Sequence, residues 1–278
     1  MKRIMLALVC LSLAACGGQT GALEPEWSTP NTLKTPESIK YDPERGHIYV
    51  SNINGNPTAE DNNGFISRLS PDGEIIDLKW IEGLSAPKGM AIVGNRLYVT
   101  DIYQLAEIDL DRGEITGRYD AEGSEFLNDV AADDSGSVYV SDMSADIIYK
   151  LEEGVMKIWL REDWLERPNG LTFGDGKLYI GGAGFIRAVD ISTGTSVETI
   201  DTGFSIDGLV HDGEGGFIAS DWQGKTVRIG REGNQQVILD TSREGINSAD
   251  IEYIAEKSLL IIPTFGDNRA VAYKLGNK

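Results

Sequence analysis

Residues 127–142 read LNDVAADDSGSVYVSD and contain the pattern that decides the fold. A polar residue, Asn128, lies at the start of a short apolar segment, a turn of Asp, Ser and Gly follows, and the β-rich segment VYVSD ends the stretch. Two short apolar segments joined by such a turn predict an antiparallel pair of strands. A further apolar segment at 147–151 extends the pair, so this part of the chain predicts one small antiparallel sheet.

The same pattern recurs along the chain at intervals of about forty residues. Its first polar residue, which we call the anchor, falls at positions 37, 88, 128, 169, 207 and 247. Repeats of this length, with short strands and turns rich in glycine, are typical of propeller blades. We therefore predict an all-β fold, a six-bladed β-propeller with four antiparallel strands in each blade.

The two ends of the chain predict how the ring closes. Only three residues follow the last predicted strand, at 270–275, so the sixth blade lacks a fourth strand there. We expect residues 23–28, ahead of the first anchor, to supply it as an outer strand, because an edge position tolerates Pro25. The propeller then covers residues 35–278, and residues 16–34 hold a lipidated Cys, a tether and the closing strand.

Residues 1–15 predict a signal peptide. Lys2 and Arg3 precede an apolar run that is too short to span a bilayer, as in secretory signals. The run ends in Leu-Ala-Ala before Cys16 and resembles the lipobox of bacterial lipoproteins, so we predict lipidation of Cys16. Cleavage near Ala15 as an ordinary signal is the alternative. We expect a monomer in the cell envelope that faces the periplasm and meets the membrane only through its lipid.

Charge and composition argue against several partners and kinds of site. The chain has 25 Lys and Arg against 44 Asp and Glu, a net charge of −19, so nucleic acid is a poor partner. Two Cys and two His are too few for a zinc cluster or a disulfide framework. The sequence has no nucleophile elbow and no phosphate loop, so neither a serine esterase nor a nucleotide hydrolase has support.

In a propeller the anchors converge on one ring, because each first strand begins beside the central channel at the same face. Two carboxylates and three amides around a narrow channel need a common partner, since like charges repel and buried polar groups need hydrogen bonds. A divalent cation meets this need, most simply Ca²⁺, with Mg²⁺ or Mn²⁺ as alternatives. Ordered water in the channel is the other interpretation. The ring consists of Glu37, Lys88, Asn128, Asn169, Asp207 and Asn247.

Lys88 is the one cation of this ring. Its ammonium group could replace the metal altogether. Alternatively, its long stem carries the charge to the edge of the channel and leaves the site to Glu37, Asn128, Asn169 and Asp207.

On these residues, the chain from about residue 35 onward resembles the gluconolactonase/regucalcin family of six-bladed propellers and, more distantly, the paraoxonase-like lactonases. The resemblance implies that Glu37, in Pro-Glu-Ser, and Asn128, in Leu-Asn-Asp, bind a divalent metal, often calcium. It implies the same of Asn169, in Pro-Asn-Gly-Leu, and of Asp207, in Asp-Gly-Leu. In such enzymes this Asp also activates water against a lactone carbonyl that the metal polarises, so Asp207 is the candidate catalytic base.

One position departs from the sugar-lactone hydrolases of this family. They carry an Arg two residues before the blade-three Asn, where it holds substrate hydroxyls, and here that residue is Phe126. With other aromatic residues on the loops of the same face, Phe126 favours an apolar or aromatic ester or lactone over a sugar acid. The alternative is that these aromatic residues pack between blades. The expected pocket residues are Lys88, Tyr103, Phe126, Trp164, Trp222, Asn247 and Phe265.

The longest loop of that face is NINGNPTAEDNNG, at 52–64, which is long enough to fold over the channel mouth as a lid. A solvated loop, or a second calcium loop built from Asp61, Asn62 and Asn63, is the alternative. The sequence thus predicts a lipid-anchored, metal-dependent hydrolase of small-molecule lactones or related esters. A non-catalytic propeller that binds a partner protein or small ligand, with a structural cation or none, is the second hypothesis, because propellers host both roles.

Overall fold

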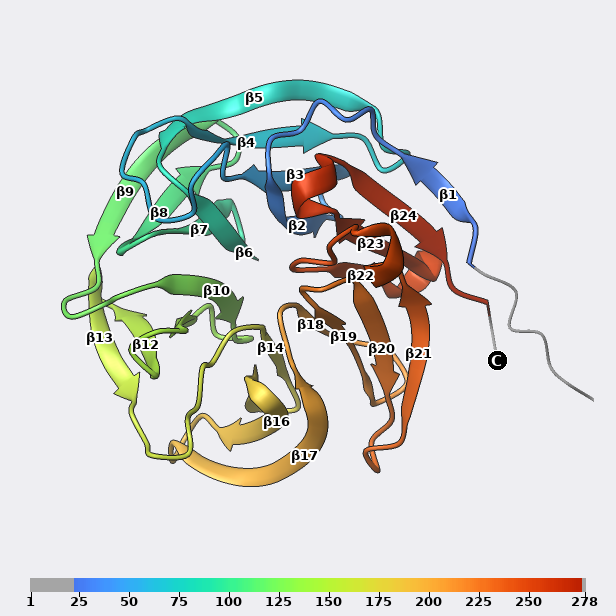
Figure 1. Ribbon diagram of the computed structural model, residues 1–278. Helices are drawn as coiled ribbons and strands as arrows, with labels where there is room; N and C mark the ends of the chain where they lie inside the picture. The colour runs from blue at the N-terminus through green and yellow to red at the C-terminus, as the bar shows by residue number, and fades with distance from the viewer. Residues whose placement is uncertain (1–22, 277–278) are drawn as a thin grey trace, which may run out of the picture.

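The computed structural model describes residues 23–276 and shows the six-bladed propeller that the repeat predicts (Figure 1). Six four-stranded antiparallel sheets surround a central axis, and five of them use four strands that are consecutive in the chain (Figure 1). Within the described part of the chain, no helix is long and apolar enough to cross a bilayer. The predicted signal peptide, Cys16 and the first part of the tether lie outside the described residues.

The blades consist, in order, of β2 (Pro36–Asp42), β3 (His47–Asn52), β4 (Gly64–Leu69) and β5 (Ile75–Leu84); β6 (Pro87–Val93), β7 (Arg96–Asp101), β8 (Gln104–Asp109) and β9 (Glu114–Asp120); β10 (Leu127–Ala132), β11 (Val138–Asp142), β12 (Ile147–Glu152) and β13 (Val155–Leu160); β14 (Leu171–Gly174), β15 (Lys177–Gly181), β16 (Ala183–Asp190) and β17 (Thr195–Ser205); β18 (Leu209–His211), β19 (Phe217–Asp221), β20 (Lys225–Ile229) and β21 (Gln235–Asp240); and β22 (Glu252–Ile254), β23 (Leu259–Pro263), β24 (Ala270–Lys274) and β1 (Pro25–Ser28). Three single-turn 3₁₀ helices, η1 (Ser242–Glu244), η2 (Ala255–Lys257) and η3 (Phe265–Asp267), lie in connections.

The ring closes as the sequence predicts, because β1 forms the outer strand of blade six. It pairs antiparallel with β24, with Trp27 opposite Ala272 and Ser28 opposite Val271. Pro25 belongs to the outermost strand of this sheet, a position that tolerates proline. The Trp27 side chain packs against the apolar cluster between blades six and one, so the closing strand also covers core.

The hydrophobic core is divided among the six interfaces between neighbouring blades. Each interface holds its own cluster of buried residues; the cluster between blades two and three, for example, joins Tyr98 and Leu105 to Val130 and Val140. Equivalent clusters fill the other five interfaces, including the one between blades six and one. Every blade therefore depends on both of its neighbours for burial of its two faces.

A buried hydroxyl near the end of the second strand joins one blade to the next at three of these interfaces, through Thr100, Ser141 and Ser220. Thr100 Oγ1 donates to the main-chain carbonyl of Asn128 at 2.5 Å. Ser141 Oγ donates to the carbonyl of Asn169 at 2.8 Å and accepts the N–H of Asp129 at 2.9 Å. We call this contact the hydroxyl bridge. It holds the main chain of two successive anchors, those of blades three and four, at a fixed separation.

The first strands of neighbouring blades approach each other closely at the residue after the anchor, which explains why three anchors are followed by glycine. A Cβ atom on Gly170 would lie 2.5 Å from the carbonyl oxygen of Asp207, and one on Gly208 would lie 2.5 Å from the main-chain nitrogen of Ile251. Gly89 is confined in the same way by Asp129. The first strands can therefore approach the axis only because these positions lack a side chain.

The hydroxyl bridge makes a first prediction. Ser141→Ala should lower the free energy of unfolding by about 1–3 kcal/mol, because it leaves the buried N–H of Asp129 and the carbonyl of Asn169 without this partner. Urea denaturation measures the change. Ser196→Ala, at an exposed position in β17, is the matched control and should leave the midpoint within error. Equal midpoints for the two variants would show that the bridge contributes nothing to stability.

Candidate functional site

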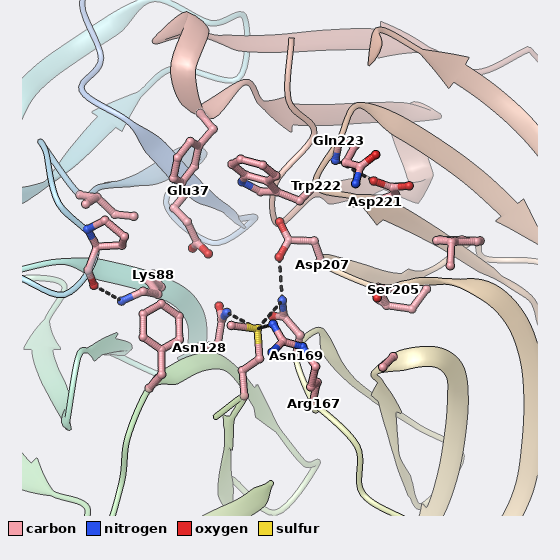
Figure 2. A pocket seen from close by; sticks show the side chains of 18 residues that line it. Glu37, Lys88, Asn128, Arg167, Asn169, Ser205, Asp207, Asp221, Trp222 and Gln223 are labelled. Atoms are coloured by element: carbon pink, nitrogen blue, oxygen red, sulfur yellow. Dashed lines mark hydrogen bonds between the residues drawn. The ribbon is translucent and has the colours of Figure 1, made fainter. Parts of the chain in front are cut away.

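Five anchors line one cavity of about 610 Å³ at the end of the central channel (Figure 2). Glu37, Lys88 and Asn128 lie at the starts of β2, β6 and β10, and Asn169 and Asp207 lie two residues before β14 and β18. All five side chains are buried, with exposed fractions between 1% and 8%. The convergence that the repeat predicts is therefore present for these five positions.

The sixth anchor is Ala249, two residues beyond the predicted Asn247. Ser220 Oγ accepts the N–H of Gly208 and donates to the carbonyl of Ala249 at 2.6 Å, as Ser141 does to that of Asn169. The shift leaves Asn247 outside the ring and outside the cavity lining, with its amide donating to the carbonyl of Trp222. The segment Ile-Asn-Ser-Ala at 246–249 has the same order of apolar, polar, small and apolar residues as Ile-Asp-Gly-Leu at 206–209, which explains the misplaced register.

The two anchor carboxylates each keep a buried oxygen without a partner. Glu37 Oε2 and Asp207 Oδ2 have no hydrogen-bond donor among the described residues. The second oxygen of Asp207, Oδ1, accepts a hydrogen bond of 2.7 Å from the amide of Asn169. Figure 2 shows both carboxylates directed toward the space between them, with Asn128 and Asn169 beside it. Buried carboxylate oxygens of this kind need either a bound proton or a cationic ligand.

The two anchor amides complete this set of oxygen groups. Their nitrogens approach the sulfur of Met143, at 3.9 Å for Asn128 and 3.8 Å for Asn169. With the nitrogens so placed, each side-chain carbonyl oxygen is available to another ligand. No cluster of three or more His, Cys, Asp and Glu within residues 23–276 could hold a metal ion, so the two amides are needed to complete any such site.

Burial makes the ionised carboxylates costly in the absence of a cation. It raises the pKa of Glu37 well above its ordinary value, and the charge of Asp207 adds to this effect while Lys88 opposes it. Burial also raises the pKa of Asp207 to about 7, against the hydrogen bond from Asn169. A bound divalent cation would remove this cost, and two carboxylates with two neutral carbonyl oxygens form a donor set that Ca²⁺, Mg²⁺ or Mn²⁺ accepts. The residues present therefore fit the metal that the sequence predicts.

The ammonium group of Lys88 lies at the edge of the ring. It donates to the carbonyl oxygens of Ala86, at 3.0 Å, and Pro57, at 3.3 Å, and lies 4.5 Å from the centre of the Phe126 ring. Burial lowers the pKa of Lys88 to about 8, although Glu37 and Asp101 favour the charged form. Its contact with Pro57 joins it to the loop of residues 52–64, which contributes Ile53 and Pro57 to the cavity wall (Figure 2).

The rest of the wall is mainly apolar, and some of the expected aromatic residues line it. Phe126, Trp222 and Phe265 do so, and the rings of Trp222 and Phe265 meet edge to face at 5.5 Å. The cavity is not lined by Tyr103, in the tight turn between β7 and β8, where the side chain is 40% exposed. Trp164 is also absent from the lining, because it packs between blades three and four, as the alternative interpretation of the aromatic residues expects, with the guanidinium of Arg187 4.7 Å from its ring.

The structure adds lining residues that the sequence analysis did not single out, and the most informative is Arg167. It lies two residues before Asn169, the same offset that separates Phe126 from Asn128. Comparing this offset across all blades, and not in blade three alone, would have found it. The other additions are Ile53, Pro57, Ala183, Phe204, Ser205, Ile206, Asp221 and Gln223.

Comparisons with known proteins support the fold and go no further. No family model matches the chain, and no curated protein matches it. Among solved structures, a streptogramin B lyase is similar with a TM-score of 0.65 and 13% identity, over 87% of this chain and 94% of the lyase. A catalytically inactive virginiamycin B lyase from Staphylococcus aureus with quinupristin has a TM-score of 0.61 and 13% identity, over 87% of this chain and 95% of the lyase. The WD40 propeller domain of Doa1 has a TM-score of 0.65 and 13% identity, over 87% of this chain and 79% of that domain.

The carboxylate pair predicts stabilisation by a divalent cation. Ca²⁺ at about a hundred times its Kd should add about 2.7 kcal/mol of stability and raise the melting temperature by several degrees. Glu37→Gln should lose most of this rise, because the neutral amide replaces one of the two charges. Calorimetry with Ca²⁺ and with a chelator measures both effects, and the exposed Glu232→Gln is the control. A midpoint that neither Ca²⁺, Mg²⁺ or Mn²⁺ nor chelation moves would exclude the cation site.

The raised pKa of Asp207 predicts that the stability of the metal-free protein depends on pH. An acid whose pKa is higher in the folded than in the unfolded chain holds its proton more tightly when folded, so stability falls as pH rises from about 4 to about 7. In chelator at pH 8, Asp207→Asn should therefore melt several degrees above the wild type while losing the response to Ca²⁺. Asp163→Asn, on an exposed loop, should do neither. A less stable Asp207→Asn under these conditions would contradict the assigned direction.

Proposed function

We propose that this protein is a metal-dependent hydrolase of lactones or related esters, as the resemblance to gluconolactonase-type propellers implies. The observation that carries the proposal is the pair of unpartnered carboxylate oxygens, Glu37 Oε2 and Asp207 Oδ2, in one cavity with Asn128 and Asn169. These four residues would hold the cation. When bound, such a cation polarises an ester carbonyl and lowers the pKa of water beside it.

Asp207 is the residue best placed to take a proton from water. Its Oδ1 is held by the amide of Asn169, which fixes the carboxylate, while its Oδ2 carries no hydrogen bond in the described structure. The hydrolysis adds water across the acyl carbon–oxygen bond, and Asp207 accepts the proton that the attacking water loses. The leaving oxygen takes up a proton, so that an ester yields an acid and an alcohol and a lactone yields one hydroxy acid.

The wall of the cavity supports an apolar or aromatic substrate. Phe126, Trp222 and Phe265 are joined there by Phe204 and Met143. Such a surface contributes binding energy through burial of apolar area and makes few hydrogen bonds to a polyhydroxylated sugar ring. The lid expected at residues 52–64 is supported by the two residues it contributes to the wall, Ile53 and Pro57.

The envelope location forms part of the same proposal. It rests on Cys16 and the apolar run before it, and the predicted attachment is through lipid alone. The similar streptogramin and virginiamycin B lyases are named as lyases, so cleavage by elimination is a reaction to be distinguished from hydrolysis. A non-catalytic binding propeller stays as the second candidate, because Phe126 stands where sugar-lactone hydrolases of the resembled family carry Arg.

A panel of lactones and aryl esters tests the proposal. We expect turnover with Ca²⁺, Mg²⁺ or Mn²⁺, loss of turnover on chelation, and a fall in kcat of about 10²–10⁴-fold in Asp207→Asn. Asp163→Asn should retain full activity. Mass spectrometry of the products tells the addition of water from elimination. A metal-loaded protein that is inert across the panel would instead favour the binding propeller for these substrate classes.

A further inference from the structure

Arg167 is a cation at the candidate site whose donors are largely unused. It lines the cavity beside Asn169 (Figure 2), and none of the ion pairs formed by arginines within residues 23–276 includes it. The side-chain contact it makes within that part of the chain is between Nη2 and the sulfur of Met143, at 3.7 Å. A thioether is a weak acceptor and a guanidinium has five N–H donors, so most of them stay available to a ligand.

The main chain holds Arg167 in a conformation that favours glycine. Its φ is +48°, in the left-handed region, and it precedes Pro168, which restricts it further. Its N–H donates to Asp146 Oδ1 at 2.7 Å, so a carboxylate from the connection between β11 and β12 holds the main chain. Retaining a long side chain here costs about 1 kcal/mol or more, and such strain is concentrated at functional sites. The strained turn places the guanidinium at the cavity.

The other cation of the cavity is already engaged. The ammonium group of Lys88 is bound by two main-chain carbonyls and the face of Phe126, and it is 1% exposed. Arg167 is exposed at the cavity wall. A ligand that enters the cavity therefore meets the guanidinium of Arg167 rather than the ammonium of Lys88.

The charges that line the cavity indicate the charge of its ligand. The lining carboxylates are Glu37, Asp207 and Asp221, and the lining cations are Lys88 and Arg167. The divalent cation of the proposed function would keep all three carboxylates ionised, and together with the five side chains it would leave one net positive charge. In a partly buried cavity, such an excess is best balanced by a ligand with a single negative charge. The apolar wall at Phe126, Phe204, Trp222 and Phe265 accommodates the rest of that ligand.

We propose that Arg167 binds a carboxylate of the substrate, so that the cavity selects monoanionic esters or lactones with an apolar or aromatic body. This inference rests on the proposed function and narrows its substrate class. A guanidinium pairs with a carboxylate through two parallel hydrogen bonds, which fixes the orientation of the bound molecule as well as its charge. Arg167 is thereby a specificity-determining residue of the blade-four loop.

Binding of two isosteric probes to the Ca²⁺-loaded chain tests this inference without any turnover. Titration calorimetry should show that phenylacetate binds more tightly than neutral phenylacetamide. Arg167→Gln should weaken the binding of phenylacetate about tenfold to a hundredfold and leave the affinity for phenylacetamide within about twofold of the wild type. Arg161→Gln removes the same charge from the same loop outside the cavity and should change neither. Arg167→Lys keeps the charge but loses the planar guanidinium, so its affinity for phenylacetate should lie between those of the wild type and Arg167→Gln.

The inference is overturned if the wild type binds both probes equally, or if Arg167→Gln weakens both alike or neither. The last result would assign the carboxylate to the metal or to Lys88. A protein that shows the Arg167-dependent preference but hydrolyses no ester keeps the inference as a property of a binding cavity and removes the hydrolase proposal, so the two failures are distinguishable. If hydrolysis is found, Arg167→Gln should raise KM for a carboxylate-bearing aryl ester and leave kcat and the matched neutral ester unchanged.

Discussion

A buried hydroxyl at the end of a second strand is the contact on which the ring and its site both depend. Ser141 accepts the N–H of Asp129 in its own blade and donates to the carbonyl of Asn169 in the next. Asn128 and Asn169 are both proposed metal ligands, so the bond that sets the spacing of two blades also sets the spacing of two ligands. Ser220 makes the same bridge from blade five to blade six. A site supported by the scaffold's own hydrogen bonds needs little adjustment when a ligand arrives.

The periodic part of the structure could be predicted from the sequence, because the same pattern of strands and turns recurs in every blade. The blades, the closing strand and five converging anchors all follow from spacing and strand pattern. The prediction failed in blade six, where Asn247 lies in a segment that resembles the other anchors and the spacing alone could not choose between Asn247 and Ala249. The choice is made by Ser220, whose hydroxyl binds Ala249, and a hydrogen bond between blades has no signature in a pattern of apolar residues.

The directions of side chains on the loops were beyond prediction for a different reason. A loop position fixes which face a residue lies on, but the local turn and the neighbouring blade decide where its side chain points. Trp164 was expected at the cavity and instead packs with Arg187 between blades three and four. Arg167, three residues later, reaches the cavity because a left-handed main chain turns it inward. The unpartnered oxygens of Glu37 and Asp207 likewise become visible only when every neighbour is in place.

The closing strand imposes an order of events on the growing chain. Thr29, just after β1, bonds to Ala270 across 241 residues of sequence, so the first strand to be made is also the last to find its partner. Through nearly all of synthesis, blade one lacks blade six as its neighbour, and the apolar side of Trp27 stays uncovered. Contacts this distant in sequence slow folding, since the loop must close before they contribute.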